Sequence, residues 1–247
     1  MRSLQSLFNT SVLWPESLPG WLLLRHWDVA QILPSCCLLL CIGRFFALWQ
    51  APLFHRKPTV MTTPYFFGYG SLVNRQTHVY RDAHPATLKG WRRCWRHIAD
   101  LDTAFLTATP SADDEIEGLI AAVPGADWAA LDQREMYYAR VNTGGVEHGL
   151  NFAPEVQHYH APLELNPPAD GLRPILLSYL DVVVQGYLTE HGEAGVGRFF
   201  ETTDGWDAPI LNDRATPRYP RYQLLSNAER DLVDRYLAVI GATVSTR

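Results

Sequence analysis

A short stretch of aromatic residues and glycines, residues 66–72 with the sequence FFGYGSL, constrains the fold of this chain most. Residues 65–67 are apolar without polar alternation, which predicts a buried strand. Gly68 and Gly70 then allow backbone conformations that a side chain would hinder, so the strand is expected to feed a tight loop. Such a loop can turn several backbone N–H groups the same way and form a small anion cradle. An ordinary strand followed by a turn is the alternative, because a lone Gly-x-Gly run is a weak signal.

Strands come first along the chain and helices later. A turn signal at residues 110–114 (PSADD) predicts that the strands on either side of it form a hairpin. Ser226 and Glu229 have the spacing of a capping box and open the last helix. This order predicts an α+β fold, with helices that return to cover a sheet, rather than alternating β-α-β units. The predicted strands span residues 65–67, 86–98, 104–109, 116–123, 137–143, 149–152 and 156–161, and the predicted helices span 128–136, 175–188, 194–202 and 227–240.

Residues 1–60 differ in composition from the rest of the chain. They hold half of the eight tryptophans and all but one of the four cysteines. Their uncharged stretch, residues 29–43, is shorter than the roughly 20 residues that a membrane span needs. Three interpretations remain open: an upstream extension with translation starting at Met61, a membrane anchor, or a docked apolar arm. We favour the first, because the sequence from Met61 leads directly into the first strand, and we treat residues 61–247 as one domain.

Charge and cysteine content narrow the class of function. The chain has 247 residues and a formal net charge of −5, and it has no basic stripe, which argues against binding to nucleic acid. Cys94 is the single cysteine of the predicted domain and has no partner there for an internal disulfide. This suits a reducing compartment, so a cytoplasmic location without stable membrane association is expected.

Glu135 is the carboxylate that stands out. On a helix over residues 128–136 it shares a face with Trp128 and Leu131, which should pack inward and draw Glu135 toward the core. The negative end of the helix dipole and the burial would both raise the pKa of this carboxyl, as a general acid or base near neutral pH requires. The alternative is that Glu135 pairs with Arg134 or Arg140, or reaches water.

The loop and the glutamate together resemble the gamma-glutamylcyclotransferase-like superfamily, and most closely its ChaC-like, glutathione-acting branch. The run Tyr69-Gly70-Ser71-Leu72 resembles the signature loop of the family, and Glu135 after Arg134 resembles its catalytic glutamate. The resemblance covers about residues 64–160. In the ChaC-like pattern a glycine follows the glutamate, whereas Met136 follows it here. The fold that the resemblance implies is a small mixed β-barrel with helices packed around it.

The resemblance also implies a reaction. A γ-glutamyl amide, such as glutathione or a γ-glutamyl amino acid, would cyclise to 5-oxoproline and release its amine. Glu135 would act as general base and acid, and Tyr69, Gly70, Ser71 and Leu72 would bind the glutamyl end. The expected partner is therefore a small-molecule γ-glutamyl substrate, and no metal or other cofactor is expected.

Other residues have competing interpretations. A nucleophilic role for Ser71 is disfavoured, because the residues around it do not form the Gly-x-Ser-x-Gly elbow. His158 and His160 share a strand face and could begin a zinc site, but no third ligand is placed by spacing. In the loop over residues 204–222, Arg214, Tyr219 and Arg221 either close over the substrate or serve the structure, and the sequence does not decide between these roles.

Three alternative functions are also compatible with the sequence. A γ-glutamylamine cyclotransferase would keep the fold and the chemistry and change the leaving amine. A binding module would keep the pocket without turnover. The third alternative, a membrane-tethered protein, is supported by residues 29–51 alone.

Overall fold

A computed structural model describes residues 62–98, 101–162, 166–168 and 173–246. The predicted extension over residues 1–60 lies outside these residues, so its interpretation stays a prediction. None of the helices that the described residues form is long and apolar enough to cross a membrane.

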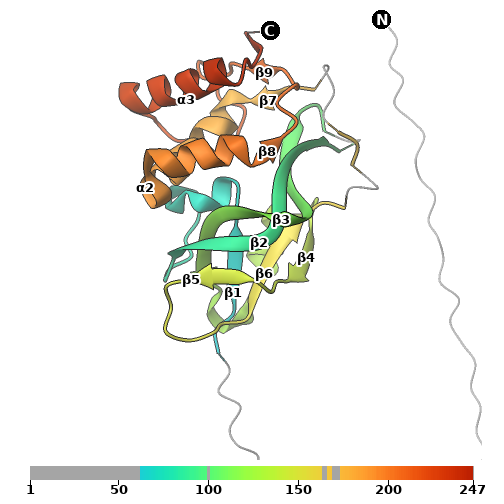
Figure 1. Cartoon of the computed structure of the whole chain (residues 1–247), viewed down its shortest axis with the longest axis vertical. Coiled ribbons are helices and arrows are strands. Elements are labelled where there is room, and N and C mark those ends of the chain that lie inside the picture. The colour runs from blue at the N-terminus through green and yellow to red at the C-terminus, as the bar shows by residue number, and fades with distance from the viewer. Residues whose placement is uncertain (1–61, 99–100, 163–165, 169–172, 247) are drawn as a thin grey trace, which may run out of the picture. The chain divides into compact units, whose positions relative to one another are not determined.

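The central element is the strand β1 (Tyr65–Gly68), all four residues of which are buried. It lies between β3 (Ala104–Ala122), which runs antiparallel to it, and β6 (Val156–His160), which runs parallel to it. These strands belong to a seven-stranded sheet of order β4-β6-β1-β3-β2-β5, in which β8 also pairs with β2 (Figure 1). The other strands are β2 (His84–His97), β4 (Ala139–Asn142), β5 (Val146–His148) and β8 (Thr203–Asp204).

The hairpin predicted at residues 110–114 is wrong. Residues on both sides of this segment belong to the single strand β3, and both halves pair with β2. The register shifts between Lys89 and Trp91, which pair with Glu115 and Pro110 respectively, so four residues of β3 bulge opposite Gly90. Gly90 has a φ of 81°, a conformation that favours glycine. The turn residues therefore bend a continuous pair of strands instead of ending one.

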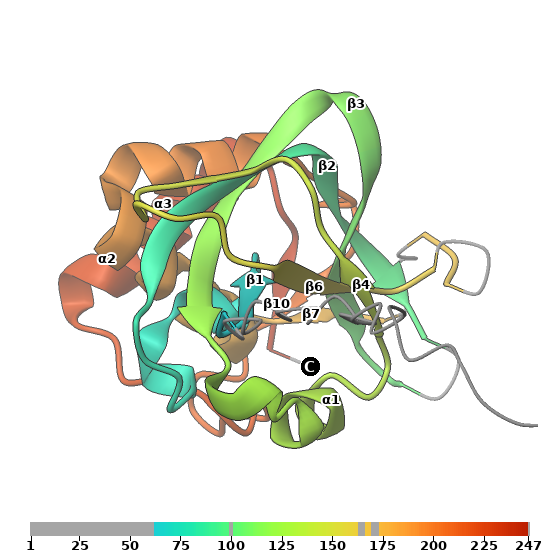
Figure 2. The ribbon, with the colours of Figure 1, turned by 90° about the horizontal axis from the view of Figure 1, so that it is seen from below.

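The helices lie mainly to one side of the sheet (Figure 2). The element α2 (Leu177–Glu201) contains Gly192, whose φ of 69° and ψ of −174° are not helical, so two helices meet there at a kink. This agrees with the separate helices predicted over residues 175–188 and 194–202. The last helix, α3 (Asn227–Val239), begins with both hydrogen bonds of the predicted capping box. A small parallel sheet joins β7 (Ile175–Leu176), β9 (Ile210–Leu211) and β10 (Val244–Ser245).

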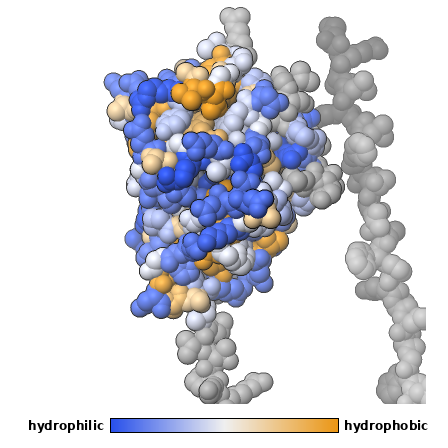
Figure 3. Space-filling view, in the orientation of Figure 1, coloured by the Kyte–Doolittle hydropathy of each residue, from blue (hydrophilic) through white to orange (hydrophobic). Residues whose placement is uncertain are grey.

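The α+β class predicted from the sequence is confirmed. The finer expectation of a closed β-barrel is not: in the described part of the chain, the end strands β4 and β5 each pair with one neighbour only, and the sheet is open. The predicted strand over residues 149–152 is also wrong, because β5 ends at His148. The face seen in Figure 3 is mostly hydrophilic, and its hydrophobic residues form small groups, which is ordinary for a folded surface.

Candidate active site

The loop after β1 folds into a short 3₁₀ turn, Ser71–Val73. Its hydrogen bonds run from the N–H of Val73 to the carbonyl of Gly70, at 3.0 Å, and from the N–H of Asn74 to the carbonyl of Ser71, at 3.2 Å. The amides of Ser71 and Leu72 stand at the start of the turn, where a helical turn leaves its own N–H groups without internal acceptors. The loop thus presents amides at the end of a buried strand.

The two glycines of the loop are required by close packing rather than by a positive φ. A Cβ on Gly68 would collide with the Cβ of Leu72. A Cβ on Gly70 would lie 2.6 Å from the hydroxyl oxygen of Tyr179, which belongs to α2. The tight loop predicted from these glycines is therefore present, and its cause is the approach of other atoms to the backbone.

Gly70→Ala is expected to destabilise the protein by about 1–3 kcal/mol, the usual cost of overpacking a buried site. The Tyr179 hydroxyl is the obstacle, so the same change made together with Tyr179→Phe should cost clearly less. Thermal or urea unfolding of the two single variants and the double variant measures this coupling. Equal costs of Gly70→Ala in both backgrounds would contradict the packing argument.

Glu135 lies at the carboxyl end of the helix α1 (Ala129–Arg134). Trp128 and Leu131 are buried, at 8% and 1% exposure, so the face predicted to pack inward does so. The helix is shorter than predicted: Glu135 is its C-cap, and the N–H of Glu135 still bonds the carbonyl of Leu131 at 2.9 Å. The side chain of Glu135 therefore leaves the helix at its negative end.

One cavity brings the glutamate and the loop together. It is lined by Glu135 and by every residue from Phe67 to Leu72, so the predicted site residues Tyr69, Gly70, Ser71 and Leu72 all border the space that Glu135 borders. Its remaining walls are largely aromatic. They are formed by Leu106, Tyr138, Tyr159 and Tyr179.

The environment of Glu135 raises the pKa of its carboxyl. Its side chain is only 16% exposed, and burial raises the pKa of the carboxyl above its usual value. The positive charges of Arg134 and Arg221 act against this rise in pKa, and Nε of Arg134 lies 3.1 Å from the carboxylate of Glu135. The pairing with Arg134 and the position in the cavity, which the sequence offered as alternatives, therefore occur together.

Arg134 and Tyr219 contact the candidate site through Ser71, and the sequence analysis did not place either of them there. The Nη2 of Arg134 donates to Ser71 Oγ at 3.1 Å, and the Tyr219 hydroxyl donates to the same oxygen at 2.8 Å. Arg134 also donates to the carbonyl of Thr77 at 2.9 Å. Neither an arginine nor a phenol is the general base that a nucleophilic serine needs, so these contacts favour a binding role for Ser71.

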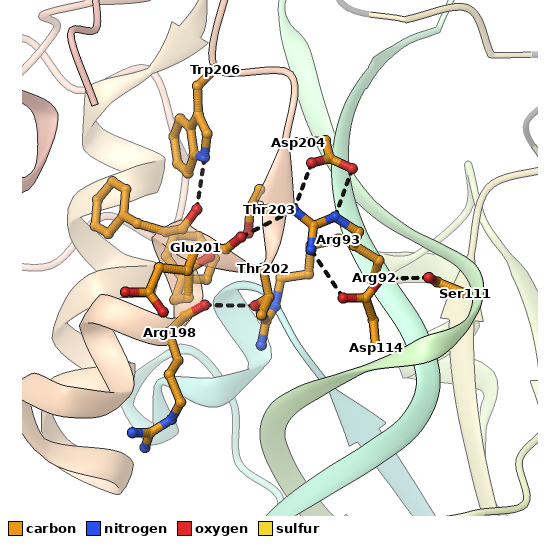
Figure 4. Close-up of polar contacts among 12 residues, drawn as sticks. Arg92, Arg93, Ser111, Asp114, Arg198, Glu201, Thr202, Thr203, Asp204 and Trp206 are labelled. Atoms are coloured by element: carbon orange, nitrogen blue, oxygen red, sulfur yellow. Dashed lines mark hydrogen bonds and ion pairs between the residues drawn. The ribbon is translucent and has the colours of Figure 1, made fainter. Parts of the chain in front are cut away.

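A buried arginine holds the loop from behind. Arg93 on β2 is fully buried, and its guanidinium donates to the carbonyl of Tyr69 at 3.3 Å and to the hydroxyls of Thr202 and Tyr187, both at 2.6 Å. Its neighbour Arg92 instead binds the carboxylates of Asp204 and Asp114 (Figure 4). The Tyr69 side chain is fixed as well, because its hydroxyl donates to the carbonyl of Tyr159 at 2.6 Å.

The three loop residues whose roles the sequence left open, Arg214, Tyr219 and Arg221, make different contacts in the structure. Arg214 is structural, because it binds carboxylates of two helices. Its shortest contacts are 2.7 Å to Asp181 on α2 and 2.8 Å to Asp234 on α3. Tyr219 contacts the site through Ser71. Arg221 is exposed and acts on Glu135 by its charge.

The histidines do not form a metal centre in the described part of the chain. His158 is buried beside Trp91, with ring centroids 4.4 Å apart, and burial lowers its pKa to about 4. No group of three or more histidine, cysteine, aspartate or glutamate side chains among the described residues is arranged to hold a metal ion.

Comparison with known proteins gives only structural matches. No protein-family model and no curated protein matches the sequence. The crystal structure of YkqA from Bacillus subtilis is 17% identical, with a TM-score of 0.46, and the match covers 56% of this chain and 53%, about half, of that one. A gamma-glutamyl cyclotransferase structure is 15% identical, with a TM-score of 0.44, over 70% of this chain and 99% of that one. The yeast gamma-glutamyl cyclotransferase specific to glutathione is 16% identical, with a TM-score of 0.36, over 71% and 97% of the two chains.

The matched structures thus include members of the superfamily that the loop and the glutamate resemble. Each of these TM-scores lies below one half, so the likeness carries no argument about this chain's activity.

Proposed function

We propose that the protein is a gamma-glutamylcyclotransferase, which converts a γ-glutamyl amide into 5-oxoproline and a free amine. One observation carries the proposal: the Glu135 carboxyl, with its raised pKa, and the loop from Gly68 to Leu72 line the same cavity. The sequence motif that resembles the superfamily supplies the same two elements.

The reaction is an internal acyl transfer. The α-amine of the glutamyl group attacks its own γ-carbonyl, a new C–N bond closes the five-membered ring, and the C–N bond to the leaving amine breaks. Holding the glutamyl chain folded supplies much of the acceleration, because the reacting groups are already joined. In this mechanism the amides of the loop bind the glutamyl end and donate to the oxyanion that develops on the γ-carbonyl.

The proton balance fits a single carboxylate. The substrate ammonium gives up two protons when it becomes the ring nitrogen, and the leaving nitrogen gains two when it departs as an ammonium. Glu135 would transfer these protons in turn and end in its starting state, with no water consumed. Burial raises the pKa values of Tyr138 and Tyr179 well above their usual value, so these phenols stay neutral and neither competes with Glu135 as the base.

The direct test is release of 5-oxoproline. The protein is incubated with glutathione, with γ-glutamyl amino acids and with γ-glutamylamines, and 5-oxoproline and free amine are measured together. We expect both products in equal amounts from at least one substrate. Binding of 5-oxoproline without turnover of any substrate would instead indicate the binding module.

The pH dependence of the reaction follows from the charges around Glu135. As a base Glu135 must be ionised, so kcat/KM should rise with pH through a midpoint above the usual range of a glutamate, because burial raises its pKa. Arg134 lowers that pKa, so Arg134→Gln should move the midpoint to still higher pH.

Arg221→Gln is the matched variant, because it removes a charge near Glu135 and leaves the hydrogen bonds of Ser71 in place. It should move the midpoint in the same direction by a smaller amount, since the Arg134 charge has the larger effect. A profile of kcat/KM against pH for both variants measures this. A shift to lower pH in either would show that Glu135 is not the group that titrates.

A further inference from the structure

A second cavity adjoins the catalytic one and has a different chemistry. Its volume is about 170 Å³, and it shares Leu106, Tyr138 and Tyr179 with the catalytic cavity. Phe105, Leu176 and Tyr219 form much of the rest of its wall. An apolar cavity of about 150 Å³ is large enough to bind benzene, so this one has room for an aromatic ring or a branched alkyl group.

Two of the hydroxyl groups that border this apolar cavity are already engaged in hydrogen bonds. The Tyr138 hydroxyl donates to the carbonyl of Leu106 at 2.9 Å, and the Tyr219 hydroxyl donates to Ser71 Oγ at 2.8 Å. No charged side chain stands among the described residues that line it. The nearby Arg218, which precedes Tyr219, is paired with Asp102 at 2.6 Å.

Tyr219 connects the two cavities. Its hydroxyl binds Ser71 of the glutamyl-binding loop, while its ring packs on Tyr179 at a centroid distance of 5.0 Å and lines the apolar cavity. A γ-glutamyl amide whose glutamyl end lies against the loop has its leaving group on the other side of the scissile bond. The apolar cavity lies on the other side of the wall that the two cavities share. It is large enough to hold the leaving group.

Accordingly, we propose that the apolar cavity receives the body of the leaving amine, and that the substrate class is a γ-glutamyl amide of an apolar amine without a carboxylate beside the scissile nitrogen. The proposal rests on the proposed function. An amino acid or dipeptide leaving group would bring a carboxylate against a largely apolar lining without a cationic partner, where the carboxylate loses hydration and gains no counter-charge.

The test compares three substrates that differ by one group each. γ-Glutamylphenethylamide has the ring and no carboxylate, γ-glutamylphenylalanine has both, and γ-glutamylmethylamide has neither. We expect kcat/KM for the phenethylamide to exceed that of each of the other two by at least about tenfold. Equal or faster turnover of γ-glutamylphenylalanine would overturn this inference and leave the proposed function standing. Absence of 5-oxoproline from every γ-glutamyl substrate, glutathione included, would overturn the proposed function itself.

A charge placed in the apolar cavity should change the preference. Thr103 lines this cavity, does not line the catalytic one and lies outside the regular strands, so Thr103→Arg adds a cation with little risk to folding. The ratio of kcat/KM for γ-glutamylphenylalanine over γ-glutamylphenethylamide should then rise at least about tenfold. Val239→Arg adds the same charge at an exposed position of α3 and should leave the ratio unchanged. An unchanged ratio in Thr103→Arg, or an equal rise in both variants, would contradict the placement of the leaving amine.

Discussion

Glu135→Gln is expected to lower kcat/KM for 5-oxoproline release by about a thousandfold, within the range that a general acid–base residue contributes. Glutamine keeps the size of the side chain and an oxygen that can accept from Arg134, which lies 3.1 Å away. What it loses is the ability to take a proton from the substrate ammonium and return one to the leaving nitrogen. The loss should therefore fall on kcat, with KM and the affinity for 5-oxoproline little changed.

The control for this variant is a matched change elsewhere. Glu147→Gln makes the same chemical substitution on β5, where the glutamate is 63% exposed and pairs with Lys89, and it should leave kcat within about twofold, since exposed pairs contribute little. Circular dichroism and thermal unfolding verify that both variants fold. If Glu135→Gln kept more than about a tenth of the wild-type kcat, the assigned role of Glu135 would be wrong.

Local sequence patterns predicted the structural elements at the centre of the candidate site. The apolar run before Gly68 predicted β1, and the inward face of Trp128 and Leu131 predicted that Glu135 points toward the core. These predictions succeeded because period and glycine content depend on residues close in sequence. The capping box at Ser226 succeeded for the same reason.

The residues that the sequence did not assign to the site reach it over long distances in the chain. Ser71 is 63 residues from Arg134 and 148 from Tyr219, and only the tertiary fold brings them together. Arg93 lies in a run of three arginines around Cys94 and Trp95, and nothing local distinguishes the buried one. The prediction of a hairpin at residues 110–114 failed because the residues that favour a tight turn also suit a bulge. Only the pairing with β2 decides between the two.

Arg93→Met is expected to lower the free energy of unfolding by about 3–5 kcal/mol, because it removes several buried hydrogen bonds from a charged donor, each of which contributes about 1.5–3 kcal/mol. Arg93 is fully buried, and it donates to the carbonyls of Tyr69 and Glu117. The Tyr187 hydroxyl also contacts both carbonyls, but its one proton can serve only one of them at a time. Methionine would fill the space and leave the other carbonyl without a donor, which is itself costly.

Arg92→Met is the matched control, because it makes the same change one residue earlier on β2. Arg92 pairs with Asp204 and Asp114 at the surface, with its side chain 26% exposed, and its loss should cost no more than about 1 kcal/mol. Urea unfolding of both variants gives the two free energies, and thermal unfolding should show Arg93→Met melting about 10 °C below Arg92→Met. Because Arg93 fixes the carbonyl of Tyr69 in the loop, the Arg93→Met protein that remains folded should also bind 5-oxoproline more weakly. Equal stabilities of the two variants would mean that the loop is held by its own packing, without the arginine behind it.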